Sequence, residues 1–208
     1  MIEMTETICS VRKPSMKRKE MASLIQEKSI QLFKEKGFDN VTVLDICKEC
    51  SITKPTFYRF AATKGDLLSQ HYGALLRDMP SKWDDPESNG GYFNCVMAGL
   101  NACLDALTAD GYDMATQLLL QAIIIGDASL NIPESFEFRL SHLIEDGQRA
   151  DVFENRQSAD SLAATLVDLV RGYLTSWASR FGQTDIYRSV EQSAKAVLRP
   201  ALKGGRVD

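Results

Sequence analysis

Apolar residues recur three and four positions apart along almost the whole chain, and only short segments alternate with a period of two. The first such stretch places Ile25, Leu32 and Phe33 on one face, and Gly37 follows it where a left-handed residue commonly ends a helix. The pattern therefore predicts an all-α protein of about nine helices. The expected helices span residues 16–36, 42–50, 54–60, 64–79, 91–109, 112–128, 133–148, 158–181 and 185–202.

Three threonines mark the expected starts of helices near the N-terminus. Thr42 and Thr63 are each followed three residues later by an aspartate, Asp45 and Asp66, which is the spacing of a capping box. Thr53 opens another short helix after a tight turn. Two short helices joined by such a turn, behind a longer first helix, are typical of a helix-turn-helix, whose second helix enters the major groove of DNA.

Charge is distributed unevenly between two expected domains, residues 1–63 and residues 64–208. The 208 residues carry a net charge of −4. The overall charge therefore argues against a protein that binds polyanions simply by being basic. Residues 10–64, however, hold 12 basic and 6 acidic side chains, so this segment is +6 and the rest of the chain is −10. A basic N-terminal helix-turn-helix domain followed by a larger acidic helical domain is the organisation that we expect.

The sequence as given shows no targeting signal. It contains no apolar run of 18 residues, the length needed to span a membrane, and its first 15 residues lack the apolar centre of a secretory signal. We therefore expect a cytoplasmic protein with no membrane partner. The odd count of 5 cysteines fits reduced thiols.

Six short motifs lie within residues 32–68: Leu32-Phe33, Gly37-Phe38, Thr42-Val43, Asp45-Ile46, Thr53-Lys54-Pro55-Thr56-Phe57-Tyr58-Arg59 and Thr63-Lys64-Gly65-Asp66-Leu67-Leu68. In these residues and their spacing the segment resembles the DNA-binding region of the TetR family of bacterial transcriptional regulators. The chain departs from the family at several positions. The family usually has glycine where this chain has Ser51 and Pro55, and alanine where it has Cys47 and Cys50. Ala61-Ala62 replaces a segment that commonly holds an aromatic residue.

The resemblance implies a set of DNA contacts. Thr42, Tyr58 and Lys64 would contact phosphates, since helix N-termini and cations suit that role. Lys54, Thr56 and Arg59 would face base edges, with Arg59 the candidate for a bidentate contact to guanine. The alternative for each residue taken singly is an ordinary solvated charged face. For the set, the resemblance favours binding of double-stranded DNA at a palindromic operator.

The middle helices are unusually apolar and contain a few polar groups, as the wall of a small-molecule cavity would. An ordinary core is the alternative for any single residue. The resemblance favours a pocket, because family members bind an effector in the C-terminal domain and thereby change the separation of their DNA-reading heads. The candidate pocket residues are Cys95, Cys103, Tyr112, Met114, Gln117 and Gln121. The identity of the effector is open.

The last two expected helices each carry an apolar stripe. Such stripes either cover the core of the same chain or meet a partner, and large aromatic residues favour an interface. A four-helix bundle formed by two copies is also what the resemblance implies, so we expect a homodimer. The candidate interface residues are Leu162, Leu166, Leu169, Val170, Tyr173, Trp177, Ile186, Val190, Ala194 and Val197.

The sequence gives little support for a catalytic site or a metal site. His71 and His142 stand at no familiar ligand spacing from the Cys47/Cys50 pair, and we expect both histidines on helix surfaces or in a pocket wall. The cysteine pair lies in a helical pattern, which favours buried packing over zinc binding or redox chemistry. We expect no catalytic residue, metal or cofactor. The second hypothesis is a helical small-molecule binding protein or enzyme with a non-functional DNA-binding head.

Overall fold

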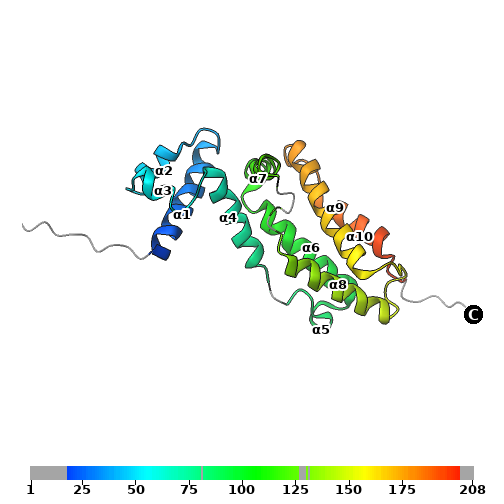
Figure 1. Ribbon diagram of the computed structural model, residues 1–208. Helices are drawn as coiled ribbons and strands as arrows, with labels where there is room; N and C mark the ends of the chain where they lie inside the picture. The colour runs from blue at the N-terminus through cyan, green and yellow to red at the C-terminus, as the bar shows by residue number, and fades with distance from the viewer. Residues whose placement is uncertain (1–17, 81, 127–129, 131, 202–208) are drawn as a thin grey trace, which may run out of the picture.

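A computed structural model describes residues 18–80, 82–126, 130 and 132–201, and these residues form helices joined by short turns (Figure 1). Within this part of the chain there is no β-strand, and one isolated bridge joins Phe153 to Pro200. The prediction of an all-α fold is confirmed. The helices are α1 (Arg18–Lys36), α2 (Val43–Glu49), α3 (Lys54–Phe57), α4 (Lys64–Arg77), α5 (Pro86–Asn89), α6 (Tyr92–Thr108), α7 (Gly111–Ile125), α8 (Glu134–Arg149), α9 (Ala159–Ser179) and α10 (Ile186–Leu198).

Four elements differ appreciably from the prediction. Helices α7 and α10 end at Ile125 and Leu198, because Gly126 and Arg199 adopt left-handed backbone; the expected ends at residues 128 and 202 lie outside the described residues. The loop expected after residue 79 contains the extra short helix α5, which Asp85 caps and Gly90 ends with φ +75°. Helix α3 ends at Phe57 rather than at residue 60, because the next amides turn more tightly. The N–H of Phe60 bonds to the carbonyl of Phe57, only three residues back, at 2.8 Å.

The predicted threonine caps are confirmed. Thr42 accepts a hydrogen bond from the backbone of Asp45, whose carboxylate accepts one in return from the Thr42 amide at 2.9 Å. Thr63 and Asp66 form the same reciprocal pair, and Thr53 caps α3. These local bonds fix where α2, α3 and α4 begin.

The helices are held together by one continuous apolar core. Phe33 and Phe57, 1% and 0% exposed, join α1 to α3 at the N-terminal end. Leu100 and Leu104 of α6 are fully buried in the C-terminal part, where α6 packs against α4, α8, α9 and α10. Trp83 packs closely on Gly99, where a Cβ would lie 2.5 Å from the indole.

The apolar stripe of the last two helices belongs to this core. Leu162, Leu166, Val170, Ile186, Val190 and Ala194 are at most 3% exposed within one chain. They cannot touch a partner without opening the domain, which corrects their assignment to a subunit interface. The other four predicted residues, Leu169, Tyr173, Trp177 and Val197, are half-buried against the core.

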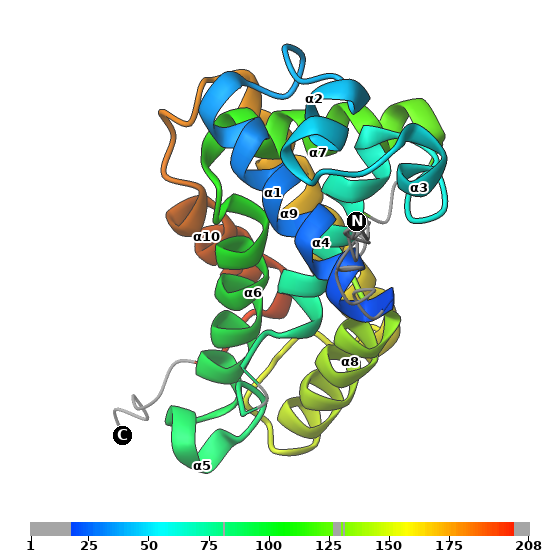
Figure 2. The ribbon, with the colours of Figure 1, turned by 90° about the vertical axis from the view of Figure 1, so that its left-hand side faces the viewer.

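Helices α1, α2 and α3 gather at one end of an elongated molecule, and α9 and α10 lie at the other (Figure 1). Helix α4 leads from the first group to the second and packs against α1, α6 and α7. The view turned by 90° shows α7 close to the N-terminal group (Figure 2). Among the described residues, no helix has the length and hydropathy needed to cross a membrane.

Candidate nucleic-acid interface

The turn between α2 and α3 has a left-handed residue at its centre. Ser51 has φ +52°, and the amide of Ile52 bonds back to the carbonyl of Cys47 at 2.9 Å. A serine therefore adopts the conformation for which glycine is favoured. The turn closes despite this substitution and sets α3 at an angle to α2.

Helix α3 separates a buried face from an exposed one. Phe57 is fully buried, whereas Lys54 and Arg59 are exposed, and Tyr58 is 54% exposed with its ring edge-on to Phe57 at 5.4 Å. Among the described residues, the charged groups of Lys54 and Arg59 form no ion pair. Lys54 at the start of α3 and Arg59 just after its end are thus open to solvent, while Phe57 anchors the helix in the core.

Thr42 and Thr56, also predicted to contact DNA, lie at the starts of α2 and α3. Thr42 is exposed, and its hydroxyl lies 2.6 Å from the carboxylate of Asp45. Hydrogen bonds from the side chain and backbone of Thr42 hold the pKa of Asp45 below its usual value. Thr56 is half-buried, with its hydroxyl 3.0 Å from that of Thr53.

Lys64, at the start of α4, is engaged within the chain. Its ammonium donates to the backbone carbonyls of Phe38 at 2.6 Å and Val41 at 3.0 Å, and it lies 4.3 Å from the centre of the Phe38 ring. These contacts tie α4 to the segment that leads into Thr42. Lys64 therefore positions the N-terminus of α2, a role that the sequence alone did not indicate.

A buried carboxylate joins the N-terminal unit to the rest of the chain. This unit consists of α1, α2 and α3 and is the candidate DNA-binding unit. Asp110, which precedes α7, has a side chain only 5% exposed and pairs with Lys34 of α1 and His71 of α4. Burial disfavours ionisation of this carboxyl, but the hydrogen bonds and charges of His71 and Lys34 outweigh it, so the pKa of Asp110 is lowered. His71 thus lies at a junction between helices rather than at a free surface or in a pocket wall.

Two of the predicted pocket residues face this junction. The amide of Gln117 donates to Asp39 at 3.2 Å, and a Cβ at Gly65 would overlap the side chain of Gln121. Helix α7 therefore rests on the α1–α2 turn and on the start of α4. Its polar side packs against the DNA-binding unit, where the sequence had predicted a ligand.

The other predicted pocket residues lie elsewhere. Cys95 and Cys103 are fully buried in α6, where burial raises the pKa of both thiols, that of Cys103 to about 12. Met114 is buried, and Tyr112 is exposed with its ring 6.2 Å from that of Phe181. The structure does not bring the six residues together around one cavity.

The cysteine pair of α2 is buried, as the helical pattern led us to expect. Cys47 and Cys50 are 5% and 6% exposed, and burial raises the pKa of both thiols, that of Cys50 to about 11. Such thiols are poor nucleophiles. In the described part of the chain, no group of three or more His, Cys, Asp or Glu side chains is arranged to hold a metal ion.

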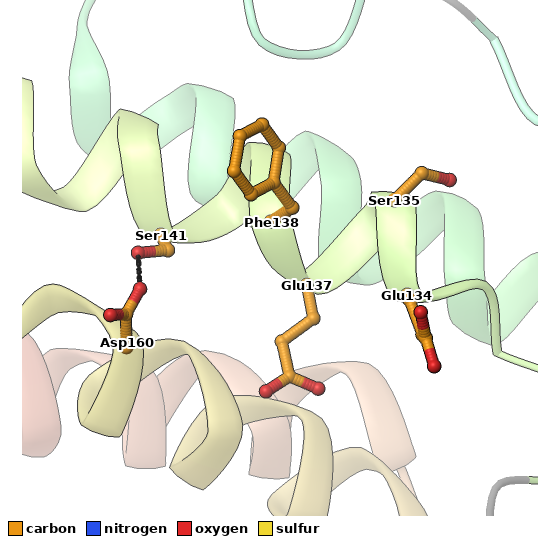
Figure 3. A pocket seen from close by; sticks show the side chains of 6 residues that line it. All are labelled: Glu134, Ser135, Glu137, Phe138, Ser141 and Asp160. Carbon is orange, nitrogen blue, oxygen red and sulfur yellow. Dashed lines mark hydrogen bonds between the residues drawn. The ribbon is translucent and has the colours of Figure 1, made fainter.

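An acidic hollow of about 540 Å³ lies between α8 and the start of α9 (Figure 3). Glu137 extends from α8 toward α9, and Asp160 reaches back to the hydroxyl of Ser141 at 2.5 Å. The exposed ring of Phe138 points away from these carboxylates. Negative charge makes this surface unsuitable for DNA, which leaves the N-terminal unit as the candidate interface.

The N-terminal unit matches a known family. Residues 25–70 match the model of the tetR family of bacterial regulatory proteins. Fifty residues are 42% identical to the uncharacterised HTH-type transcriptional regulator YuxN of Bacillus subtilis, a match that covers 24% of this chain and 17% of that protein.

The whole chain resembles solved TetR structures in its fold. FadR of Thermus thermophilus, a TetR family repressor crystallised with lauroyl-CoA, superposes with a TM-score of 0.69 at 17% identity, covering 90% of this chain and 98% of that one. A TetR-family regulator from Syntrophomonas wolfei gives 0.60 at 20% identity, covering 90% and 99%. Residues 25–70 thus match the family model, and about 90% of the chain shares the fold of these solved TetR-family regulators.

Proposed function

We propose that this protein is a one-component transcriptional repressor. It binds a palindromic operator in double-stranded DNA as a homodimer, and a small-molecule effector changes its affinity for DNA. The observation that carries the proposal is the pair of exposed cations on either side of the buried Phe57 in the chain: Lys54 begins α3, and Arg59 follows its end. We expect no catalytic activity and no cofactor, and a regulator of bacterial DNA would act in the cytoplasm.

Lys54, Thr56 and Arg59 are the proposed base-reading residues. Lys54 at the start of α3 and Arg59 just after its end are exposed to solvent, as side chains that enter a major groove must be. Arg59 has the fork that can meet the O6 and N7 atoms of guanine together. Thr42 and Tyr58 are proposed to contact phosphates.

We propose that Lys64 contacts DNA phosphates directly and also holds the backbone at the N-terminus of α2 in place. Its ammonium is bonded to two carbonyls in the free protein, yet the side chain is only half-buried. Its charge raises the local positive potential near the N-terminus of α2, where backbone amides also favour an anion.

Helix α7 is the proposed route by which an effector alters DNA binding. One side of α7 contacts the DNA-binding unit through Asp110 and Gln117, and the other packs against α9. A ligand that shifts α7 relative to α9 would therefore move the contacts that hold α1 and α4. The structure of FadR in complex with lauroyl-CoA supports the binding of a small molecule by a repressor of this fold.

The proposed dimer uses the outer surface of α9 and α10. Leu169, Tyr173, Trp177 and Val197 remain half-exposed after the core is packed, so a partner could cover them. Light scattering should show twice the chain mass at micromolar concentration, and Leu169→Lys should give a folded monomer. A wild-type monomer that binds the operator would contradict the dimer.

Selection of DNA fragments by the purified protein, followed by sequencing, tests the proposal as a whole. We expect an enriched inverted repeat whose affinity falls steeply with salt, because the basic N-terminal segment displaces counterions from phosphates. If no sequence is enriched and binding is insensitive to salt, the alternative gains support, namely a helical small-molecule binding protein or enzyme with a non-functional DNA-binding head.

A further inference from the structure

Leu44 of α2 is 49% exposed, whereas the same helix buries Ile46 and Cys47 in the core. In residues 18–80, all of which the structure describes, the exposed large apolar side chains are Leu44 and Tyr58. One exposed leucine is ordinary on a protein surface, so exposure alone indicates no function. What Leu44 can contact depends on the side of α2 that it occupies.

Two contacts orient α2 between its neighbours α1 and α3, against both of which it packs. Glu49 pairs with Lys28 of α1 at 3.3 Å, so the flank of α2 that carries Glu49 faces α1. Burial raises the pKa of the Cys47 thiol, while the positive charge of Lys54, at the start of α3, acts in the opposite direction. The flank that carries Cys47 therefore lies beside the start of α3.

Leu44 belongs to this second flank. It lies three residues before Cys47 and four before Lys48, and residues with these spacings are neighbours on a helix surface. It is five residues from Glu49, which places the two side chains about 140° apart around the helix axis. Leu44 is therefore exposed on the side of α2 that lies next to α3 and away from α1.

Lysines accompany Leu44 on this surface. Lys48 is exposed on α2, and Lys54 is exposed at the start of α3. In a helix-turn-helix the first helix crosses the DNA backbone, and the N-terminal residues of the second contact base edges. A side chain of the first helix that lies beside the start of the second thus comes to the edge of the major groove. The apolar group available there is the C5-methyl of thymine, and the anions nearby are phosphates.

We propose that Leu44 reads a thymine in each operator half-site through an apolar contact with its C5-methyl group, while Lys48 contacts a neighbouring phosphate. Leu44 stands outside the motifs that carry the resemblance to the TetR family, and those motifs imply no DNA contact for it. The proposal rests on the proposed repressor function and adds a base-reading residue on α2 to those on and after α3.

Replacement of thymine by 2′-deoxyuridine tests this contact, because the two nucleotides differ only in the C5-methyl group. The operator is the inverted repeat enriched by selection, and each thymine of one half-site is replaced singly. Fluorescence anisotropy at fixed salt measures the affinity of the full chain. We expect a position at which the wild type binds about fourfold more weakly, which corresponds to the loss of about 0.8 kcal/mol for one buried apolar carbon.

Three variants locate the contact. Leu44→Ala should bind the thymine operator more weakly and should no longer distinguish thymine from deoxyuridine at that position. Leu120→Ala is the matched control, because Leu120 of α7 is 45% exposed and lies outside the N-terminal unit, so it should keep the fourfold difference. Lys48→Gln should weaken binding to both operators alike and reduce the dependence of affinity on salt.

The proposal is overturned by half-sites that contain no thymine, by wild-type affinity that no loss of a methyl group changes, or by a folded Leu44→Ala variant that keeps the fourfold difference. If Leu44→Ala fails to fold, Leu44→Gln keeps the length of the side chain without its apolar end and should lose the same distinction. Each of these results leaves the repressor function standing, because affinity for the unmodified operator is measured separately. Failure to enrich any operator would overturn both proposals.

Discussion

His71 Nε2 lies 2.6 Å from Asp110 Oδ2, across the junction between α4 and α7. Because the Asp110 carboxylate is ionised in the folded protein, the imidazole nitrogen is the donor. Lys34 of α1 pairs with the other oxygen of the same carboxylate. One buried carboxylate therefore connects α1, the helix α4 that carries Lys64, and the start of α7.

Asp110→Asn should lower the free energy of unfolding by about 1–3 kcal/mol near neutral pH, because Lys34 and His71 lose a charged acceptor. Asp113→Asn, at an exposed position of α7, is the control and should have little effect. Urea unfolding of the three proteins measures the difference.

The same pair predicts a pH dependence. The folded pKa of Asp110 lies below its usual value of 3.8, so its contribution to stability is fully present above that value and is lost as the pH falls through the folded pKa. The stability difference between wild type and Asp110→Asn should shrink as the pH falls below about 4. A difference that grows in that acidic range would contradict the assigned charge.

Arg59→Ala and Lys64→Ala should weaken operator binding in different ways. Loss of Arg59 should relax the preference at one base pair of each half-site, at a cost of about 1–3 kcal/mol, without changing stability. Loss of Lys64 should weaken binding to all sequences alike and also destabilise the fold, because the carbonyls of Phe38 and Val41 lose their donor.

Competition binding with a panel of single-base operator variants, together with thermal unfolding, separates these outcomes. A uniform loss of affinity in both variants would show that Arg59 does not read a base.

Gly99→Ala should destabilise the protein by about 1–3 kcal/mol, because its Cβ would lie 2.5 Å from the buried ring of Trp83. Gly172→Ala makes the same change in helix α9, where a Cβ meets nothing within 4 Å, and should stabilise by up to about 1 kcal/mol. Chemical denaturation of both variants checks the opposite signs. Equal effects would mean that the indole moves aside freely.

Ser51→Gly should raise stability by about 0.5–1 kcal/mol, because the left-handed backbone at φ +52° strains a residue with a Cβ. Ser23→Gly, in the regular exposed backbone of α1, should lower stability by about 0.5 kcal/mol. Thermal unfolding compares the two, and destabilisation by Ser51→Gly would contradict the strain.

The sequence by itself determined the helical fold and the threonine caps. A capping box needs only residues three apart, such as Thr42 and Asp45, and the apolar period of a long helix such as α9 shows which of its sides is apolar. It did not reveal α5, because a single turn of helix within a loop has no period to detect.

Only the tertiary structure decided what covers each apolar stripe and where the buried charges pair. The periodicity of Leu166 and Val170 is the same whether they meet their own core or a partner, and packing of α9 against α8 and α10 places them in the core. Asp110 and His71 are 39 residues apart, and no local rule relates them. Helical period and capping are set by neighbours in the chain, whereas these contacts depend on how distant helices meet.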